Sequence, residues 1–150
     1  MILNTADMSE LFFNRMVETS TLKDVVSNGV DKWYAVGGFQ QGSQVDSVLL
    51  VEISQLDHSL TFRIFTHSTP GALLEGRSIV AAGNDVFIGA VTEESAWTSD
   101  GSWSKMLFFR VQPSDFSVTF KVMLGKTGVH DSLDEIAVSS DGAELYFNSA

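Results

Sequence analysis

Leu49-Leu50-Val51-Glu52-Ile53 and Leu107-Phe108-Phe109-Arg110-Val111 are two copies of one short apolar pattern in the same chain. The match continues at unchanged spacing through Asp57/Asp115, Ser59/Ser117, Thr61/Thr119, Phe62/Phe120, Arg63/Lys121 and Ile64/Val122. Apolar residues fall on apolar residues, turn residues on turn residues, and cations on cations. A repeat of this length, made of strand-sized apolar segments, predicts an all-β array of stacked units.

Each unit is expected to hold four strands. The first two form a hairpin that occurs three times, in residues 24–37, 78–89 and 135–148. Every copy has a short apolar run, a turn of Asn, Asp or Gly, and a second run that carries aromatic side chains. Asn-Gly and Asp-Gly turns supply the positive φ angles that tight hairpins need.

The other two strands of the unit are expected at residues 48–54 with 59–66, and again at residues 105–112 with 116–124. Apolar and polar residues alternate in the later strand of each pair, which indicates one solvent-facing side. The whole chain is therefore predicted to form a single domain, residues 1–150.

The predicted repeats lie near residues 24–66, 78–124 and 134–150, after a shortened or atypical first unit in residues 1–23. A strand is expected near residue 11, because residues 10–13 are similar to residues 106–109. A short helix over residues 9–26, capped by Ser9, is the alternative.

The segment Ser139-Ser140-Asp141-Gly142-Ala143-Glu144-Leu145-Tyr146-Phe147 resembles the S-x-D-G-x-x-L-Y-F element of WD40-like (TolB-type) and lactonase-type β-propeller repeats. The segment Trp33–Gly38 is also similar to bacterial propeller repeats. The resemblance covers residues 24–150 loosely, and implies that each hairpin forms the inner two strands of a propeller blade. It implies a propeller-like fold and carries no information about activity.

A closed propeller needs about 4–8 blades, whereas the sequence holds about three repeats. Unpaired strand edges need a partner, so we expect a homo-oligomer or a part of a larger assembly. Two copies that exchange half-blades would close a six-bladed ring. A β-sandwich built from the same hairpins is the alternative fold.

Composition narrows the classes of partner. The formal net charge is −10 and the pI is near 4.5, which argues against binding nucleic acid or an anionic membrane surface. The chain has no cysteine, so disulfides and thiol catalysis are excluded. No signal-peptide pattern begins the chain, and a soluble, cytoplasmic protein is slightly favoured.

The richest candidate for ligand binding is the segment from Trp97 to Trp103. Its two tryptophans offer stacking surfaces for a sugar ring, and Asp100 between them offers a hydrogen-bond acceptor. Aromatic side chains in long loops also serve as packing plugs, and that alternative stays open. His67 and His130 lie in loops expected on the same face of the array and are further candidate ligand-binding residues.

Asp131, Asp134 and Glu135 follow His130 closely. Carboxylate oxygens suit a hard cation such as Ca²⁺, although the segment lacks the D-x-D-x-D-G loop pattern. A solvated acidic loop is the favoured interpretation of this segment, and no other cofactor is expected. No convincing catalytic constellation is present, so enzymatic activity is not favoured.

The function predicted first is a non-catalytic binding or assembly module. A carbohydrate-binding propeller lectin, based on Trp97, Asp100 and Trp103, is one alternative. A propeller-type hydrolase or lactonase with a loop-bound cation is the other. A glycan or a small molecule is the expected ligand class.

Overall fold

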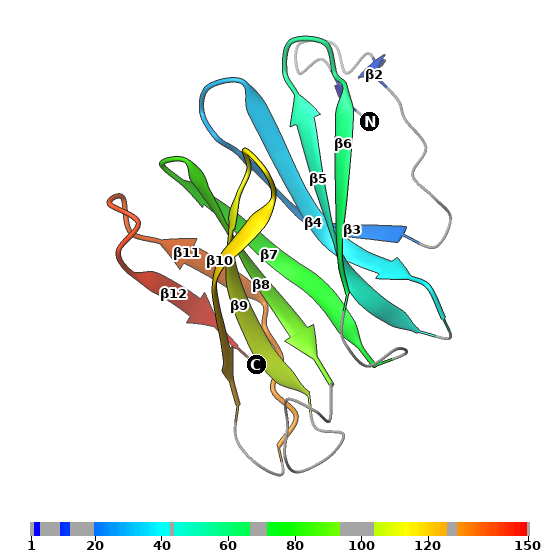
Figure 1. The fold of residues 1–150 in the computed structure, drawn as a ribbon, viewed down its shortest axis with the longest axis vertical. Coiled ribbons are helices and arrows are strands. Elements are labelled where there is room, and N and C mark those ends of the chain that lie inside the picture. The colour runs from blue at the N-terminus through cyan, green and yellow to red at the C-terminus, as the bar shows by residue number, and fades with distance from the viewer. Residues whose placement is uncertain are drawn as a thin grey trace.

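The computed structural model describes residues 2–3, 10–12, 20–42, 44–66, 72–93, 104–125 and 129–149. Over these residues the chain is all-β, with no helix, as the repeat pattern predicts (Figure 1). Nothing in this described part is a helix long and apolar enough to cross a membrane.

The strands form two four-stranded antiparallel meanders and two separate hairpins. The first meander contains β3 (Ser20–Ser27), β4 (Lys32–Gln40), β5 (Val45–Ser54) and β6 (Leu60–Thr66). The second contains β7 (Leu74–Ala82), β8 (Asp85–Thr92), β9 (Lys105–Gln112) and β10 (Ser117–Leu124). The hairpins pair β1 (Ile2–Leu3) with β2 (Glu10–Phe12) and β11 (Glu135–Val138) with β12 (Leu145–Asn148).

The meanders follow the four-strand order that the repeat predicts, but each starts a few residues earlier. The added residues include Lys23, Glu75 and Arg77, whose charges hide the strand pattern. In the structure these side chains pair with one another: Lys23 Nζ and Arg77 Nη2 lie 3.4 and 2.7 Å from the carboxylate of Glu75. Mutual pairing lets charged residues extend the strands.

At the N-terminus the structure has strands at Glu10–Phe12 and from Ser20 onward. The predicted strand near residue 11 is therefore confirmed, and the alternative helix over residues 9–26 is wrong in these parts. Residues 13–19 lie outside the described residues. β2 pairs with β1, and β3 pairs with β4. The backbone groups that a helix would bond within itself are thus bonded between strands.

A single parallel residue pair, Asp46 with Leu74, joins β5 to β7 and makes the two meanders one mixed sheet. The sheet does not close into a barrel. Strand β7 contacts β3, β4 and β5, so the second meander packs its face against the first (Figure 1). The hairpin β11–β12 lies on the other side of the second meander, where β11 contacts β7 and β8.

The main core fills the junction between the two meanders. The first meander contributes Tyr34, Val36, Val48 and Leu50, and the second contributes Leu74, Ile79, Val86, Ile88, Ala90, Leu107, Phe109 and Val111. A second core, between the second meander and β11–β12, contains Val91, Met106, Phe108, Leu133 and Ile136. Alternate residues of β9 thus face opposite neighbours, as the two-residue period of a strand requires.

The hairpin turns have the predicted conformation. Glycines with positive φ occupy all three, at Gly29 (76°), Gly83 (59°) and Gly142 (71°). The Oδ1 atom of Asn28 also accepts hydrogen bonds from the backbone N–H groups of Val30 and Lys32, at 2.9 and 3.0 Å. The turn residues therefore set the hairpins locally.

Candidate functional site

Four of the predicted ligand-binding residues, Trp97, Asp100, Trp103 and His67, lie outside the described residues. The remaining predicted residues, His130, Asp131, Asp134 and Glu135, belong to the segment that leads into β11.

The structure brings His130 against the start of β9. The Nδ1 atom of His130 lies 3.1 Å from the backbone nitrogen of Ser104 and 3.0 Å from its Oγ atom. The backbone N–H of Ser104 donates to Nδ1, so this ring nitrogen is the acceptor in that hydrogen bond. A hydroxyl beside an imidazole acceptor is one part of an acyl-transfer site. In this protein the contact between Ser104 and His130 also joins the start of β9 to the segment that precedes β11.

Beside this pair, Lys105 and Asp131 form an ion pair in a confined space. Their Nζ and Oδ2 atoms are 3.9 Å apart, and the side chain of Lys105 is only 7% exposed. A Cβ atom placed on Gly125 would lie 2.1 Å from Lys105 Cδ and 2.7 Å from Asp131 Oδ2. Gly125 therefore lets the backbone approach the pair closely.

The predicted calcium ligands are not gathered into one cluster. Asp131 faces Lys105, while Glu135 has entered β11 opposite Asn148. Asp134 donates its backbone N–H to the carbonyl of Asn148. In the described ranges, no group of three or more His, Cys, Asp or Glu side chains is arranged to hold a metal ion.

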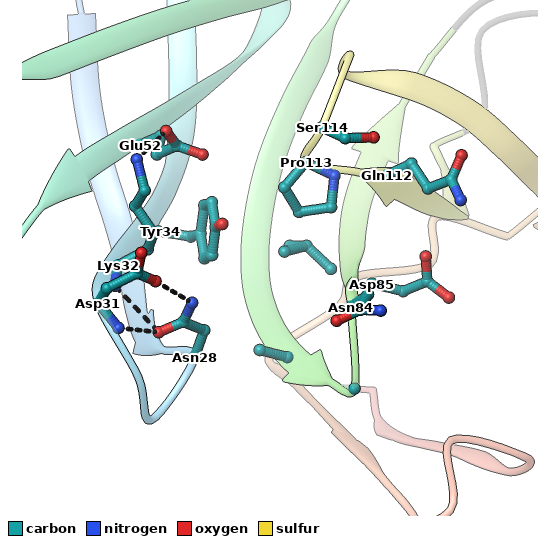
Figure 2. Close-up of a pocket in the computed structure, with 13 residues that line it drawn as sticks. Asn28, Asp31, Lys32, Tyr34, Glu52, Asn84, Asp85, Gln112, Pro113 and Ser114 are labelled. Carbon is teal, nitrogen blue, oxygen red and sulfur yellow. Dashed lines mark hydrogen bonds and ion pairs between the residues drawn. The ribbon is translucent and has the colours of Figure 1, made fainter.

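A polar cleft of about 560 Å³ opens at the opposite end, between the hairpin turns of the two meanders (Figure 2). One wall carries Asp31, Lys32 and Glu52 from the first meander. The other carries Asn84 and Asp85 from the β7–β8 turn, together with residues 112–114. The cleft lies at the edge of the main core and is of the size found for small-molecule sites, about 300–1,000 Å³.

An ion pair sets the electrostatics of the first wall. Lys32 Nζ lies 2.7 Å from Glu52 Oε1, and the hydrogen bond with Glu52 raises the pKa of Lys32. Tyr34 projects from the same strand into the cleft, beside this ion pair (Figure 2). Burial, and then the charge and hydrogen bonding of Glu52, raise the pKa of Tyr34 to about 12.

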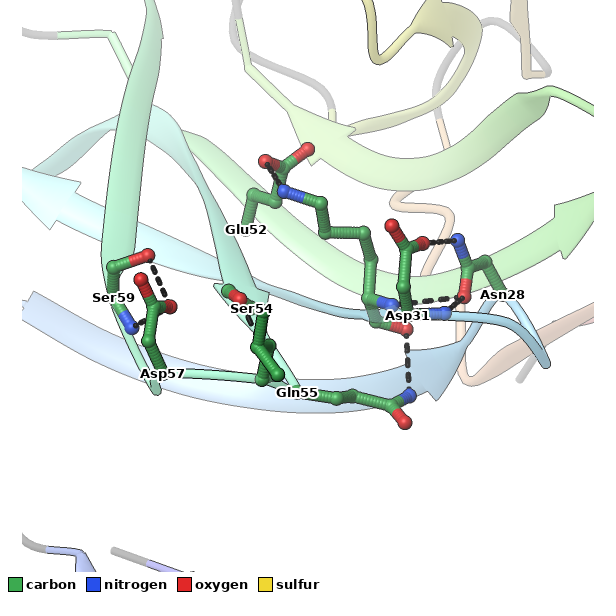
Figure 3. Close-up of polar contacts among 9 residues, drawn as sticks. Asn28, Asp31, Glu52, Ser54, Gln55, Asp57 and Ser59 are labelled. Atoms are coloured by element: carbon green, nitrogen blue, oxygen red, sulfur yellow. Dashed lines mark hydrogen bonds and ion pairs between the residues drawn. The ribbon is translucent and has the colours of Figure 1, made fainter.

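Turn contacts keep this wall in place (Figure 3). Asn28 Nδ2 donates to the carboxylate of Asp31 at 3.0 Å, and Gln55 Nε2 donates to the carbonyl of Lys32 at 3.3 Å. In the β5–β6 turn, hydrogen bonds from Ser54 and then Ser59 lower the pKa of Asp57 to about 2. The wall is thus preorganised by short-range polar contacts.

A similar cleft of about 420 Å³ lies at the next junction, between the second meander and the β11–β12 turn. Its wall repeats the ion pair with the charges reversed. Asp85 takes the place of Lys32 and Arg110 takes the place of Glu52, and Arg110 Nε lies 4.0 Å from Asp85 Oδ2. Glu52 and Arg110 hold the same position in the quoted repeat, so the exchange of acid for base was a signal that could have revealed the clefts.

Comparison with known proteins adds no further constraint. No protein-family model matches the sequence, and neither a curated protein nor a solved structure matches it significantly.

Proposed function

We propose that this chain is a non-catalytic binding and assembly module built from propeller-type repeats, whose partner is a second copy of itself. The main support is a hydrogen-bonded contact between successive units that occurs twice along the chain. The backbone N–H of Ile79 donates to Asp24 Oδ2 at 2.9 Å, and that of Ile136 donates to Ser78 Oγ at 3.2 Å. Each unit thus uses the same position to hold the next one.

The outer face of the first meander, which points away from the second meander, carries exposed apolar side chains. In the second meander, Ile79 and Leu107 point toward the first meander and are 2% and 3% exposed. In the repeat alignment, Ile79 and Leu107 correspond to Val25 and Leu49, which lie on the outer face of the first meander. Leu49 is buried in a cluster there, whereas Val25 is 53% exposed.

Other exposed apolar side chains extend this outer face. Trp33, Phe62 and Ile64 are 42%, 49% and 38% exposed. Each lies opposite an apolar residue of β5 in the register, and directly paired residues of antiparallel strands share one face. Contiguous apolar surface of this kind marks interaction sites, and the same outer face of a second copy is an apolar surface that can cover it.

Light scattering coupled to size exclusion tests the proposal. The wild-type chain should have twice the 16.4 kDa mass of a single copy. Val25→Asp should give the single-copy mass, because a charge on the outer face is desolvated on association. The matched control is Val30→Asp, at a turn residue that is 81% exposed, and its mass should equal that of the wild type. A wild-type chain that stays at 16.4 kDa at about 100 μM, well above the Kd of a stable dimer, would overturn the proposal.

The recurrence of the polar cleft favours carbohydrate binding as a second candidate. A propeller lectin is expected to repeat its binding residues in each unit, and the clefts beside Lys32–Glu52 and Asp85–Arg110 repeat in position. Acid, amide and hydroxyl groups line the first cleft and suit sugar hydroxyls. A glycan array tests this candidate: binding that is lost in Asn84→Ala, whose side chain borders both clefts, supports it, and a silent array removes it.

A further inference from the structure

A third cavity, of about 460 Å³, lies at the same junction as the polar cleft but between the outer strands β6 and β10. Its floor is apolar and is formed by Val48, Phe65, Leu74, Leu107, Phe109 and Phe116. Phe65 and Phe109 meet edge to face, with ring centroids 5.3 Å apart. The cavity therefore opens directly onto the main core.

Two cations border this apolar floor, Arg63 from β6 and Lys121 from β10. No Asp or Glu belongs to the described lining, although the chain has 19 acidic residues and only 9 Lys and Arg residues. The polar cleft at the other end is lined instead by Asp31, Glu52 and Asp85. The charged side chains of the described lining are therefore both cations.

A β-bulge explains why both cations reach one cavity. In the repeat alignment, Lys121 corresponds to Arg63 and Phe108 corresponds to Leu50. Arg63 lies opposite Leu50, on the face that packs against the second meander. A regular repeat would place Lys121 opposite Phe108, which faces the other way, toward β11–β12.

The register of β10 slips between Val118 and Phe120, so that Lys121 lies opposite Phe109 instead. Because side chains alternate across a strand, a one-residue shift moves Lys121 to the other face, toward the first meander and Arg63. Bulges that redirect a side chain occur at sheet edges, such as β10, and beside active sites. In the neighbouring turn, hydrogen bonds from Ser117 lower the pKa of the exposed Asp115 carboxyl, and the charge of Arg63 lowers it by a smaller amount.

We propose that this cavity binds a free amphiphilic anion, an acyl chain with a carboxylate head. The chain would occupy the apolar floor, and the head would pair with Arg63 and Lys121 at the rim. The volume falls in the range of small-molecule sites, about 300–1,000 Å³. The apolar floor and Arg63 lie on the inner side of β6, whereas the proposed assembly face is its outer side and shares only the edge residue Ile64 with the lining residues, so either proposal can fail without the other.

Isothermal titration with three probes of equal chain length tests the proposal. Sodium dodecanoate, below its micelle concentration, should bind the wild-type protein. Dodecanol and dodecyltrimethylammonium should bind about tenfold more weakly or worse, since they lack the negative head that two rim cations attract. Equal binding of all three probes, or no binding of dodecanoate up to about 1 mM, where even weak binding is detected, overturns the proposal.

Variants test the two parts of the site separately. The double variant Arg63→Gln with Lys121→Gln should lose about tenfold in dodecanoate affinity and most of the preference for the anionic head. Lys23→Gln, a change of cation on β3, should bind as the wild type does. Val118→Trp fills the mouth from a half-exposed lining position, opposite the core residue Val111, and should abolish binding with both cations retained.

Circular dichroism and the thermal midpoint confirm that each variant is folded. Phosphatidylglycerol vesicles separate a free ligand from a membrane lipid. Binding to vesicles without binding of monomeric dodecanoate would contradict the proposal.

Discussion

The carboxylate of Asp24 accepts a hydrogen bond from the backbone N–H of Ile79 and so joins the first strands of the two meanders, across 2.9 Å. The same carboxylate oxygen accepts a bond from Ser78 Oγ at 2.8 Å. Ser78 Oγ in turn accepts the N–H of Ile136 at 3.2 Å. Three consecutive units are therefore linked through one chain of polar contacts beside the apolar cores.

Asp24→Ala removes the first link of this chain. The substitution leaves the N–H of Ile79 without its acceptor at a buried position, so the free energy of unfolding should fall by about 2–3 kcal/mol. Urea unfolding followed by circular dichroism measures the loss. Asp134→Ala, at an exposed carboxylate, should stay within about 0.5 kcal/mol of the wild type; an equal loss in both variants would show that Asp24 has no special role.

Gly89→Ala should weaken the junction between the second meander and β11–β12. A Cβ atom on Gly89 would lie 2.3 Å from Leu133 Cδ2 and 2.9 Å from Ile136 Cγ2. We expect a loss of about 1–3 kcal/mol from overpacking, together with faster hydrogen exchange of the Ile136 amide.

Gly83→Ala provides the control for that experiment. Gly83 has a φ of 59° and open space around its Cβ position, so alanine there costs about 1–2 kcal/mol through backbone strain. Once the overall loss of stability is taken into account, hydrogen exchange of the Ile136 amide in this variant should be as slow as in the wild type. Local opening at Ile136 in both variants would contradict a junction-specific effect.

Tyr34 should ionise only at strongly alkaline pH. Its folded pKa, about 12, lies above the ordinary value of 10, so its contribution to stability is complete below pH 10 and is lost as the pH rises toward 12. The chain has two tyrosines, and Tyr146→Phe leaves Tyr34 as the only absorbing phenol. Ultraviolet titration of this variant should show a late, single step.

Glu52→Gln tests the cause of the Tyr34 shift. Burial is the larger cause and the charge of Glu52 the next, so the pKa of Tyr34 should fall in this variant but stay above 10. A step at pH 10 in the parent Tyr146→Phe protein would show that Tyr34 is not buried beside the cleft.

Asp57 should lose its proton at unusually low pH. Hydrogen bonds from Ser54 and Ser59 lower its folded pKa from 3.8 to about 2. A carboxyl with a lowered pKa stabilises the fold above its unfolded value and loses that contribution as the pH falls from 3.8 toward 2. Carboxyl NMR titration measures the pKa, and Ser54→Ala should raise it; an unchanged pKa in that variant would reassign the cause.

The strands and turns could be predicted because their signals are local. The repeated pattern around Leu49 and Leu107 predicted β5 and β9, and the Asn, Asp and Gly turns predicted the hairpins. The predicted ligand set did not follow in the same way. The spacing along the chain groups Asp131 with Asp134 and Glu135, but the ion pair of Asp131 is with Lys105, and the strands β9 and β10 lie between the two in the sequence.

By itself, the sequence determined that the chain is all-β and how its strands are ordered, because alternation and turn residues act within a few positions of each other. Only the tertiary structure decided which side chains face one another across a junction. The slip in β10 shows the physical reason: one extra residue moves Lys121 to the face of Arg63, and no count along the chain reveals it. The clefts, the linked junctions and the cationic apolar cavity all depend on such contacts between units.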